Sequence, residues 1–172
     1  SFPSISEIHK LEPALKKALR NATKKIPLRP NTVHPFTEKN RGDNTGIRIP
    51  YVNWTIQEGN KLKMTYLPKG GGSTNMSELK MMEPGRVVKG FKEVVLKRIA
   101  SMEGKPCPPT IVGVGVGGSA SLAFYLAKKA LLRPVGKHHE EKEISKIEGV
   151  LKSKANQLGV GPMGVGGETT VL

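Results

Sequence analysis

Apolar residues recur three to four positions apart in several stretches of the chain, the spacing that places side chains on one face of an α-helix. These stretches are residues 11–26, 87–102, 122–130 and 144–158. Pro13 suits the first turn of the first helix, Gly104 ends the second, and Ser119 leads into the third. The pattern predicts amphipathic helices in these stretches.

Between the first two helices the apolar spacing changes to a period of two. Apolar and polar residues alternate through residues 51–56 and again through residues 62–66, and Glu58, Gly59 and Asn60 lie between them. Alternation on both sides of a turn predicts a β-hairpin.

A further strand is predicted over residues 110–116, where an apolar, β-branched run is typical of a buried strand. Together with the hairpin it predicts an α+β fold, with a small antiparallel or mixed sheet packed with three to four helices. At 172 residues the chain is most simply a single domain over residues 1–172. Its last residues resemble an unfinished strand, so we expect more polypeptide to follow.

The composition argues against several classes of protein. A single cysteine rules out an internal disulfide framework, and no apolar run is long enough to cross a bilayer. The first residues do not have the pattern of a secretory leader. We therefore expect a cytoplasmic protein without a membrane partner.

The net charge of +14 is the strongest compositional signal. Three interpretations stay open: a solvated lysine-rich surface, binding to an anionic ligand or an acidic partner subunit, and binding to nucleic acid. Aromatic residues make up only 5% of the chain and do not alternate with the cations. Nucleic acid is therefore the least favoured of the three.

The only cysteine lies in a frame of prolines. Cys107 follows Pro106 and precedes Pro108 and Pro109, so its backbone is predicted to be extended and its thiol to be presented rather than buried. An inert thiol is the alternative, since that is the usual role of a lone cysteine. The proline frame favours a thiol that reacts or binds a metal.

Three consecutive glycines follow the predicted hairpin. Gly70, Gly71 and Gly72 would let backbone N–H groups approach a ligand closely, with serine, threonine and asparagine side chains nearby. The alternative is a flexible linker, although a linker would usually repeat glycine and serine over a longer stretch. We favour a ligand-facing loop.

Two other motifs carry weaker signals. The spacing Gly113-x-Gly115-x-x-Gly118 matches the dinucleotide fingerprint, but no second strand ends in an acidic residue about twenty positions further on. No lysine stands where a Walker A loop requires one. The adjacent pair His138-His139 could bind a metal, but neighbouring side chains diverge, so an exposed loop is favoured.

Several motifs occur together in one order that resembles a known family over most of the chain. The matching stretches are Pro27-Leu-Arg-Pro-Asn31, Gly42-Asp-Asn-Thr-Gly46, Pro68-Lys-Gly-Gly-Gly-Ser73 with Asn75-Met-Ser77, Lys105-Pro-Cys-Pro-Pro109 with 112–119, and 158–167 with 169–172. They resemble the alpha subunit, or N-terminal region, of the iron–sulfur (class I) fumarate hydratases and L(+)-tartrate dehydratases.

The resemblance implies a hydro-lyase that reversibly hydrates fumarate to L-malate, or that dehydrates tartrate. It implies a 4Fe-4S cluster held by three cysteines, whose open iron acts as a Lewis acid on the substrate. Cys107 corresponds to one of these cysteines. The other two, and a beta subunit or C-terminal beta domain, would lie outside this chain, which would be a catalytic region truncated at both ends.

The resemblance also implies substrate-binding roles for Arg29, Gly70, Gly71, Gly72 and Asn75. The arginine falls on a residue that binds a substrate carboxylate, a task suited to guanidinium, and the glycines fall on backbone that lines the pocket. No catalytic residue is assigned to this chain. A C4 dicarboxylate substrate and an oligomer are expected; a non-catalytic basic module that binds nucleotide or nucleic acid is the alternative.

Overall fold

The computed structural model describes residues 7–172, without the side chains of Val88 and Lys89. Residues 1–6, which bear on the predicted absence of a leader, lie outside this description. The chain divides into two compact units, Ser1–Tyr66 and Leu67–Leu172, and each is considered by itself. The prediction of a single domain over residues 1–172 stays a prediction.

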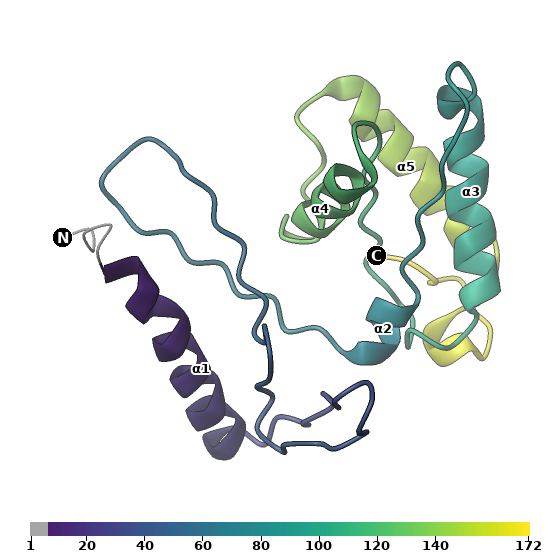
Figure 1. Cartoon of the computed structure of the whole chain (residues 1–172). Coiled ribbons are helices and arrows are strands. Elements are labelled where there is room, and N and C mark those ends of the chain that lie inside the picture. The colour runs from purple at the N-terminus through teal and green to yellow at the C-terminus, as the bar shows by residue number, and fades with distance from the viewer. Residues whose placement is uncertain (1–6) are drawn as a thin grey trace. The chain divides into compact units, whose positions relative to one another are not determined.

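The described residues form five α-helices and a short 3-10 helix (Figure 1). They are α1 (Ile8–Lys25), α2 (Gly71–Asn75), α3 (Val87–Met102), α4 (Ala120–Ala130), α5 (Lys142–Asn156) and η2 (Pro162–Gly164). Helices α1, α3, α4 and α5 confirm the four predicted from apolar spacing. One detail was wrong: α1 begins at Ile8, so Pro13 lies inside the helix, where it removes one N–H donor, rather than in the first turn.

The predicted α+β fold is wrong, because the described residues contain isolated β-bridges but no strand or sheet. Residues 51–66 form a long open loop, visible in Figure 1, instead of a hairpin. A two-stranded hairpin is marginally stable unless its apolar face packs on something. Here Val52 is half-buried, but the other alternating apolar side chains are exposed, Ile56 fully and Met64 to 63%, so this support is missing.

The predicted strand over residues 110–116 is also reduced to a single bridge. Thr110 pairs with Val171 in a parallel bridge, and the residues that follow, up to Val116, form no regular secondary structure. The fold of the described residues is therefore mainly helical.

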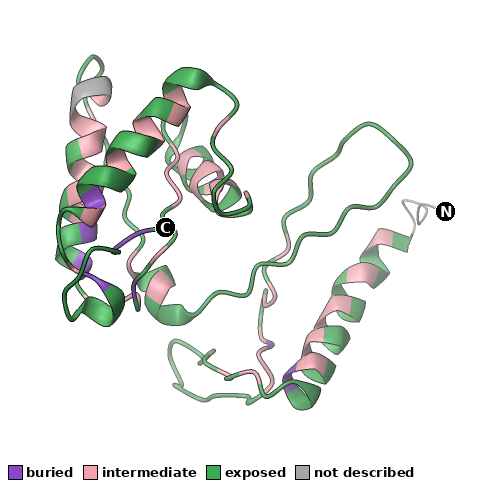
Figure 2. Ribbon diagram, turned by 180° about the vertical axis from the view of Figure 1, so that it is seen from behind, coloured by how far each residue is buried: buried purple, intermediate pink, exposed green. Residues whose placement is uncertain are grey.

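The described apolar core lies in the second unit, where α3 and α5 pack against each other. It consists of Ile99 and Met102 from α3, Ala155 from α5 and Val171 near the end of the chain. Figure 2 shows these buried positions on the two helices and on the terminal segment. The core thus ties the last residues of the chain to the end of α3, directly ahead of Cys107.

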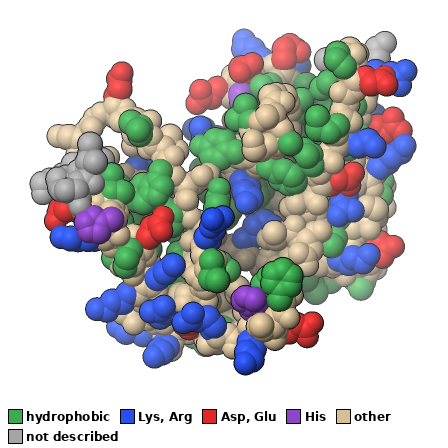
Figure 3. Space-filling view, viewed as in Figure 1, with side chains coloured by type: hydrophobic (Ala, Val, Ile, Leu, Met, Phe, Trp, Pro, Cys, Tyr) green, Lys and Arg blue, Asp and Glu red, His purple; other side chains and the backbone are tan. Residues whose placement is uncertain are grey.

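The first unit buries polar side chains instead. Its buried residues, among those described, are Thr23 on α1 and Thr45 in the loop that follows. Figure 3 shows Lys and Arg side chains gathered over the C-terminal part of α1, whose last turn carries Lys24 and Lys25. None of the described helices combines the length and the apolar character that crossing a bilayer requires.

Candidate functional site

Cys107 lies in a tight loop that starts where α3 ends. The N–H of Lys105 donates to Met102 O at 3.1 Å, and the N–H of Cys107 donates to Gly104 O at 2.9 Å. The side chain of Cys107 is exposed, as predicted, but its φ of 58° is left-handed, so the prediction of extended backbone was wrong. The successive turns, together with the prolines on either side, hold the thiol outward.

The C-terminal segment packs directly on this cysteine loop. The N–H of Met163 donates to Pro108 O at 2.8 Å. A Cβ at Gly104 would lie 2.6 Å from Met163 O, and one at Gly164 would lie 2.4 Å from the Cα of Gly104. Only two glycines allow the backbones to approach this closely, so the glycine-rich tail positions the loop that carries the thiol.

Asn156, at the end of α5, anchors that tail. Its Oδ1 accepts the N–H groups of Thr170 and Val171, both at 2.8 Å. The buried hydroxyl of Thr170 accepts the N–H of Gly161 at 3.2 Å, and the N–H of Thr110 donates to Thr170 O at 3.0 Å. Sequence reasoning missed Asn156, because nothing in the local pattern indicates which distant backbone an asparagine will satisfy.

The three glycines predicted to face a ligand open the short helix α2 and lie beside the cysteine loop. A Cβ at Gly72 would lie 3.6 Å from Lys105 O, two residues before the thiol. A Cβ at Gly70 or Gly71 would meet nothing within 4 Å, and neither glycine has a positive φ. No described part of the chain therefore requires glycine at these two positions. Asn75 is exposed at the end of the same helix.

Lys69 sits next to these glycines and binds hydroxyl groups. Its Nζ donates to Ser73 Oγ at 3.2 Å and to Thr74 Oγ1 at 3.1 Å. Burial, and then the charge of Lys128 on α4, lower the pKa of Lys69 below its ordinary value. The cation is thus held by neutral oxygens near a second cation.

The dinucleotide-like glycines have a packing role. A Cβ at Gly113 would lie 2.2 Å from Ala127 O, and one at Gly115 would lie 2.1 Å from Ala123 O. Two residues of extended chain advance about as far as one helical turn, so glycines two apart let the backbone lie against successive turns of α4. The weak fingerprint is therefore explained by contact between this segment and the helix.

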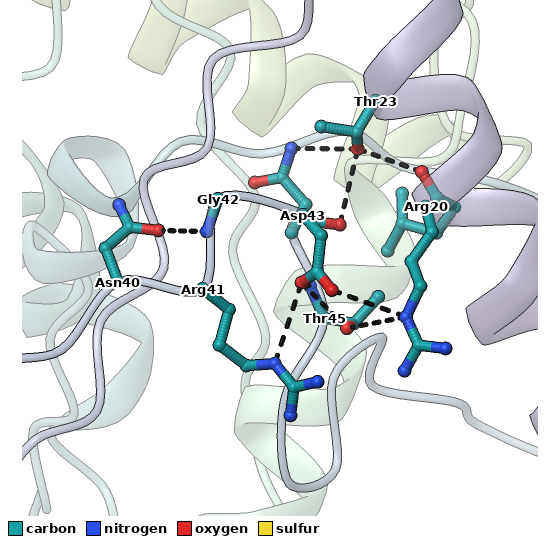
Figure 4. Close-up of polar contacts among 9 residues, drawn as sticks. Arg20, Thr23, Asn40, Arg41, Gly42, Asp43 and Thr45 are labelled. Atoms are coloured by element: carbon teal, nitrogen blue, oxygen red, sulfur yellow. Dashed lines mark hydrogen bonds and ion pairs between the residues drawn. The ribbon is translucent and has the colours of Figure 1, made fainter.

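The first unit contains a polar cluster around Asp43, drawn in Figure 4. The carboxylate of Asp43 accepts the N–H of Thr45 at 2.9 Å and its hydroxyl at 2.8 Å, and pairs with Arg20 Nε at 3.3 Å and Arg41 Nε at 3.9 Å. The two hydrogen bonds from Thr45, followed by the charges of the arginines, lower the pKa of Asp43. Asn44 Nδ2 also donates to Thr23 Oγ1 at 3.2 Å, so the loop is attached to α1 at two points.

Arg29 is exposed in the extended segment of the first unit. Its neighbour Pro30 accepts a hydrogen bond from Asn40 Nδ2 at 2.7 Å. Figure 4 shows the other bond of this side chain, in which Asn40 Oδ1 accepts the N–H of Gly42 at 2.7 Å. These bonds connect the arginine segment to the loop of the Asp43 cluster. The glycines, Asn75 and Cys107 belong to the second unit, and Arg29 to the first.

Comparison with known proteins decides the family. Residues 3–172 match the family described as Fumarate hydratase (Fumerase). The chain belongs to the fumarate hydratase family. This confirms the resemblance inferred from the motifs.

Two curated relatives show how much of a family member is present. The chain is 47% identical over 169 residues to the putative L(+)-tartrate dehydratase subunit alpha of Methanocaldococcus jannaschii, covering 97% of this chain and 59% of that protein. It is 36% identical over 172 residues to the L(+)-tartrate dehydratase subunit alpha of Escherichia coli (strain K12), covering 99% of this chain and 56% of that protein. The chain therefore spans less than two thirds of these relatives.

Iron–sulfur clusters are generally implied by this family, so we tested the donor set. The described residues contain no group of three His, Cys, Asp or Glu side chains that could hold a metal ion. His138 instead lies 3.8 Å from Glu148, which also pairs with Arg133 and accepts the N–H of His139 at 3.1 Å. Cys107 could supply one ligand of such a cluster. Its thiol is exposed, and its loop is held by hydrogen bonds and lies beside an open glycine turn.

Proposed function

We propose that this fumarate hydratase family chain is part of a hydro-lyase that reversibly hydrates fumarate to L-malate, or that dehydrates tartrate. The observation that supports this most is that Gly72 lies beside Lys105 in the loop of Cys107, which brings an exposed thiol near an open glycine turn. The complete enzyme would include a beta subunit or beta domain and form an oligomer.

Cys107 would be one of three cysteine ligands of a 4Fe-4S cluster, and the other two would come from outside this chain. The chemistry that the cluster supplies when bound is Lewis acidity at its open iron, which assists loss of the substrate hydroxyl. The chain's own contribution is to hold the Cys107 loop between α3 and the tail, so that the thiol keeps a defined position. A cysteine that binds a cluster must stay reduced, which a reducing compartment ensures. We therefore propose the cytoplasm as the location.

The other candidate residues of each unit would bind carboxylate groups of a C4 substrate. Backbone N–H groups of Gly70, Gly71 and Gly72 suit a carboxylate because no side chain blocks their approach. Asn75 would add a side-chain donor. Arg29, in the first unit, would bind a substrate carboxylate through two parallel N–H bonds, which a planar guanidinium provides and a lysine does not.

The test is anaerobic reconstitution of the complete protein, with its beta partner, using iron and sulfide. We expect the wild type to gain cluster absorbance and to convert malate to fumarate, and Cys107→Ala to gain neither. Ser101→Ala is the control, since Ser101 is exposed and its Oγ donates to Arg98 O within α3. Full iron content and activity in Cys107→Ala would refute the role of this thiol.

The substrate is decided by the same preparation. A wild-type protein that forms a cluster and acts on tartrate but not on malate would assign it to tartrate dehydration. A protein that binds no iron, but binds RNA with a steep salt dependence, would instead favour the basic binding module.

A further inference from the structure

The backbone of the glycine turn at the start of α2, Gly70–Gly72, needs other groups to hold it in one conformation. Ordering three consecutive glycines costs more backbone entropy than ordering any other three residues. Gly70 and Gly71 have no described atoms packed where a Cβ would point, so packing does not hold them on that side. The side chains of Ser73 and Thr74 bond to this turn at Gly70 O, and that of Lys69 bonds to their two hydroxyl groups.

These side chains form a closed set of hydrogen bonds around the turn. Ser73 Oγ donates to Gly70 O at 3.1 Å, and Thr74 Oγ1 donates to the same carbonyl at 3.2 Å. Lys69 Nζ donates to both hydroxyl oxygens. The directions are consistent, because each hydroxyl gives its hydrogen to the carbonyl and accepts from the ammonium, which has donors only.

The surroundings of Lys69 are not those of a stabilising ion pair. No described carboxylate forms an ion pair with Lys69. Its pKa is lowered by burial and then by Lys128. A lysine whose pKa is lower in the folded protein than in the unfolded chain destabilises the fold while it is charged. Because Lys69 is exposed, solvent makes this effect small, and the hydrogen bonds to Ser73 and Thr74 carry the argument.

We propose that Lys69 is a positioning residue that holds the Gly70–Gly72 turn in its ligand-facing shape through Ser73 and Thr74. This inference rests on the proposed function, because it takes the ligand of the turn to be the substrate carboxylate. Lys69 itself acts on the turn and not on the substrate.

Matched variants in the complete enzyme separate these two actions. Lys69→Met keeps the length of the side chain but loses its donors, and is expected to raise KM about tenfold, with a smaller change in kcat. Lys69→Arg retains donors and is expected to restore most of the wild-type KM. The control is Lys80→Met, because Lys80 is exposed and bonds to no other described residue.

A double-mutant cycle tests the route of action. Ser73→Ala with Thr74→Val is expected to raise KM as Lys69→Met does, and combining all three changes is expected to add nothing, because they remove the same restraint. If adding Lys69→Met to that pair raises KM further, Lys69 contacts the substrate directly and the inference is overturned.

Hydrogen exchange without substrate gives a readout that does not depend on activity. Lys69→Met is expected to speed exchange at the N–H of Thr74, which donates to Gly70 O at 3.3 Å, by about tenfold. An unchanged exchange rate overturns the inference, whatever the activity. Faster exchange in a protein whose wild type has no hydro-lyase activity supports the positioning role and refutes the proposed function.

Discussion

At the scale of single residues, glycines serve different purposes in different parts of the chain. Gly113 and Gly115 are required by contact with α4, and Gly104 by contact with the tail. Gly70 and Gly71 are required by neither packing nor a positive φ. Their side-chain space is free for something outside the described chain, which is the property that a ligand-binding turn needs.

Alanine at these two positions therefore has a specific expected effect. Gly70→Ala and Gly71→Ala should change the free energy of unfolding by less than about 1 kcal/mol, because the added methyl group displaces no described atom. Each should raise KM about tenfold if the backbone contacts substrate. Gly149→Ala on α5 is the control, since a Cβ there also meets nothing within 4 Å. A KM that neither Gly70→Ala nor Gly71→Ala changes would argue against the glycine turn as a binding site.

The lowered pKa of Asp43 predicts how the stability of the protein changes at acidic pH. A carboxyl whose pKa is lowered by folding stabilises the protein above its ordinary pKa, and this stabilisation is lost as the pH falls through the lowered value. Asp43→Asn should therefore unfold at lower urea than the wild type at neutral pH, and the difference should shrink below about pH 4. Glu58→Gln is the control, because Glu58 is exposed and no described cation forms an ion pair with it. A constant difference across the pH range would contradict the assigned cause.

At the scale of elements, the tail and the end of α5 act together to hold the cysteine loop. Asn156 satisfies two backbone donors of the tail, and the tail contacts Gly104 and Pro108. The glycine-rich end of the chain was a matching motif in the sequence, but its contact with the Cys107 loop became visible only in the folded chain.

Removing the Asn156 acceptor tests this connection. Asn156→Ala leaves two N–H groups without their partner and should cost about 1–3 kcal/mol. Exchange should speed up at the N–H groups of Val171 and Met163, and the second of these would show that the effect reaches the cysteine loop. Asn156→Asp keeps an acceptor oxygen and should behave like the wild type. Unchanged exchange at Met163 in Asn156→Ala would separate the anchor from the loop.

At the scale of the whole molecule, helices were predicted correctly and the sheet was not. The stretches at 11–26, 87–102, 122–130 and 144–158 carried their signal in local spacing, and helical hydrogen bonds are also local. The alternation in residues 51–66 indicated extended backbone, but pairing depends on what covers the apolar face. Exposed Ile56 and Met64 show that the described chain does not cover it.

Part of the candidate site could be predicted from the sequence, because some of its features depend on neighbouring residues alone. The exposure of Cys107 followed from its proline neighbours, and the open Gly70–Gly72 turn from three adjacent glycines. The restraint by Lys69 and the anchor at Asn156 depend on which groups meet after folding. The roles of Arg29 and Asn75 in substrate binding remain predictions.

The sequence by itself determined the helices, the exposed thiol and membership of the fumarate hydratase family, because each depends on residue type and order along the chain. The tertiary structure decided that the extended runs stay unpaired, that Gly113 and Gly115 pack on α4, and that the tail holds the cysteine loop beside the glycine turn. These outcomes depend on contacts between distant segments. The free energy of such contacts is set by which surfaces meet, and local spacing does not contain that information.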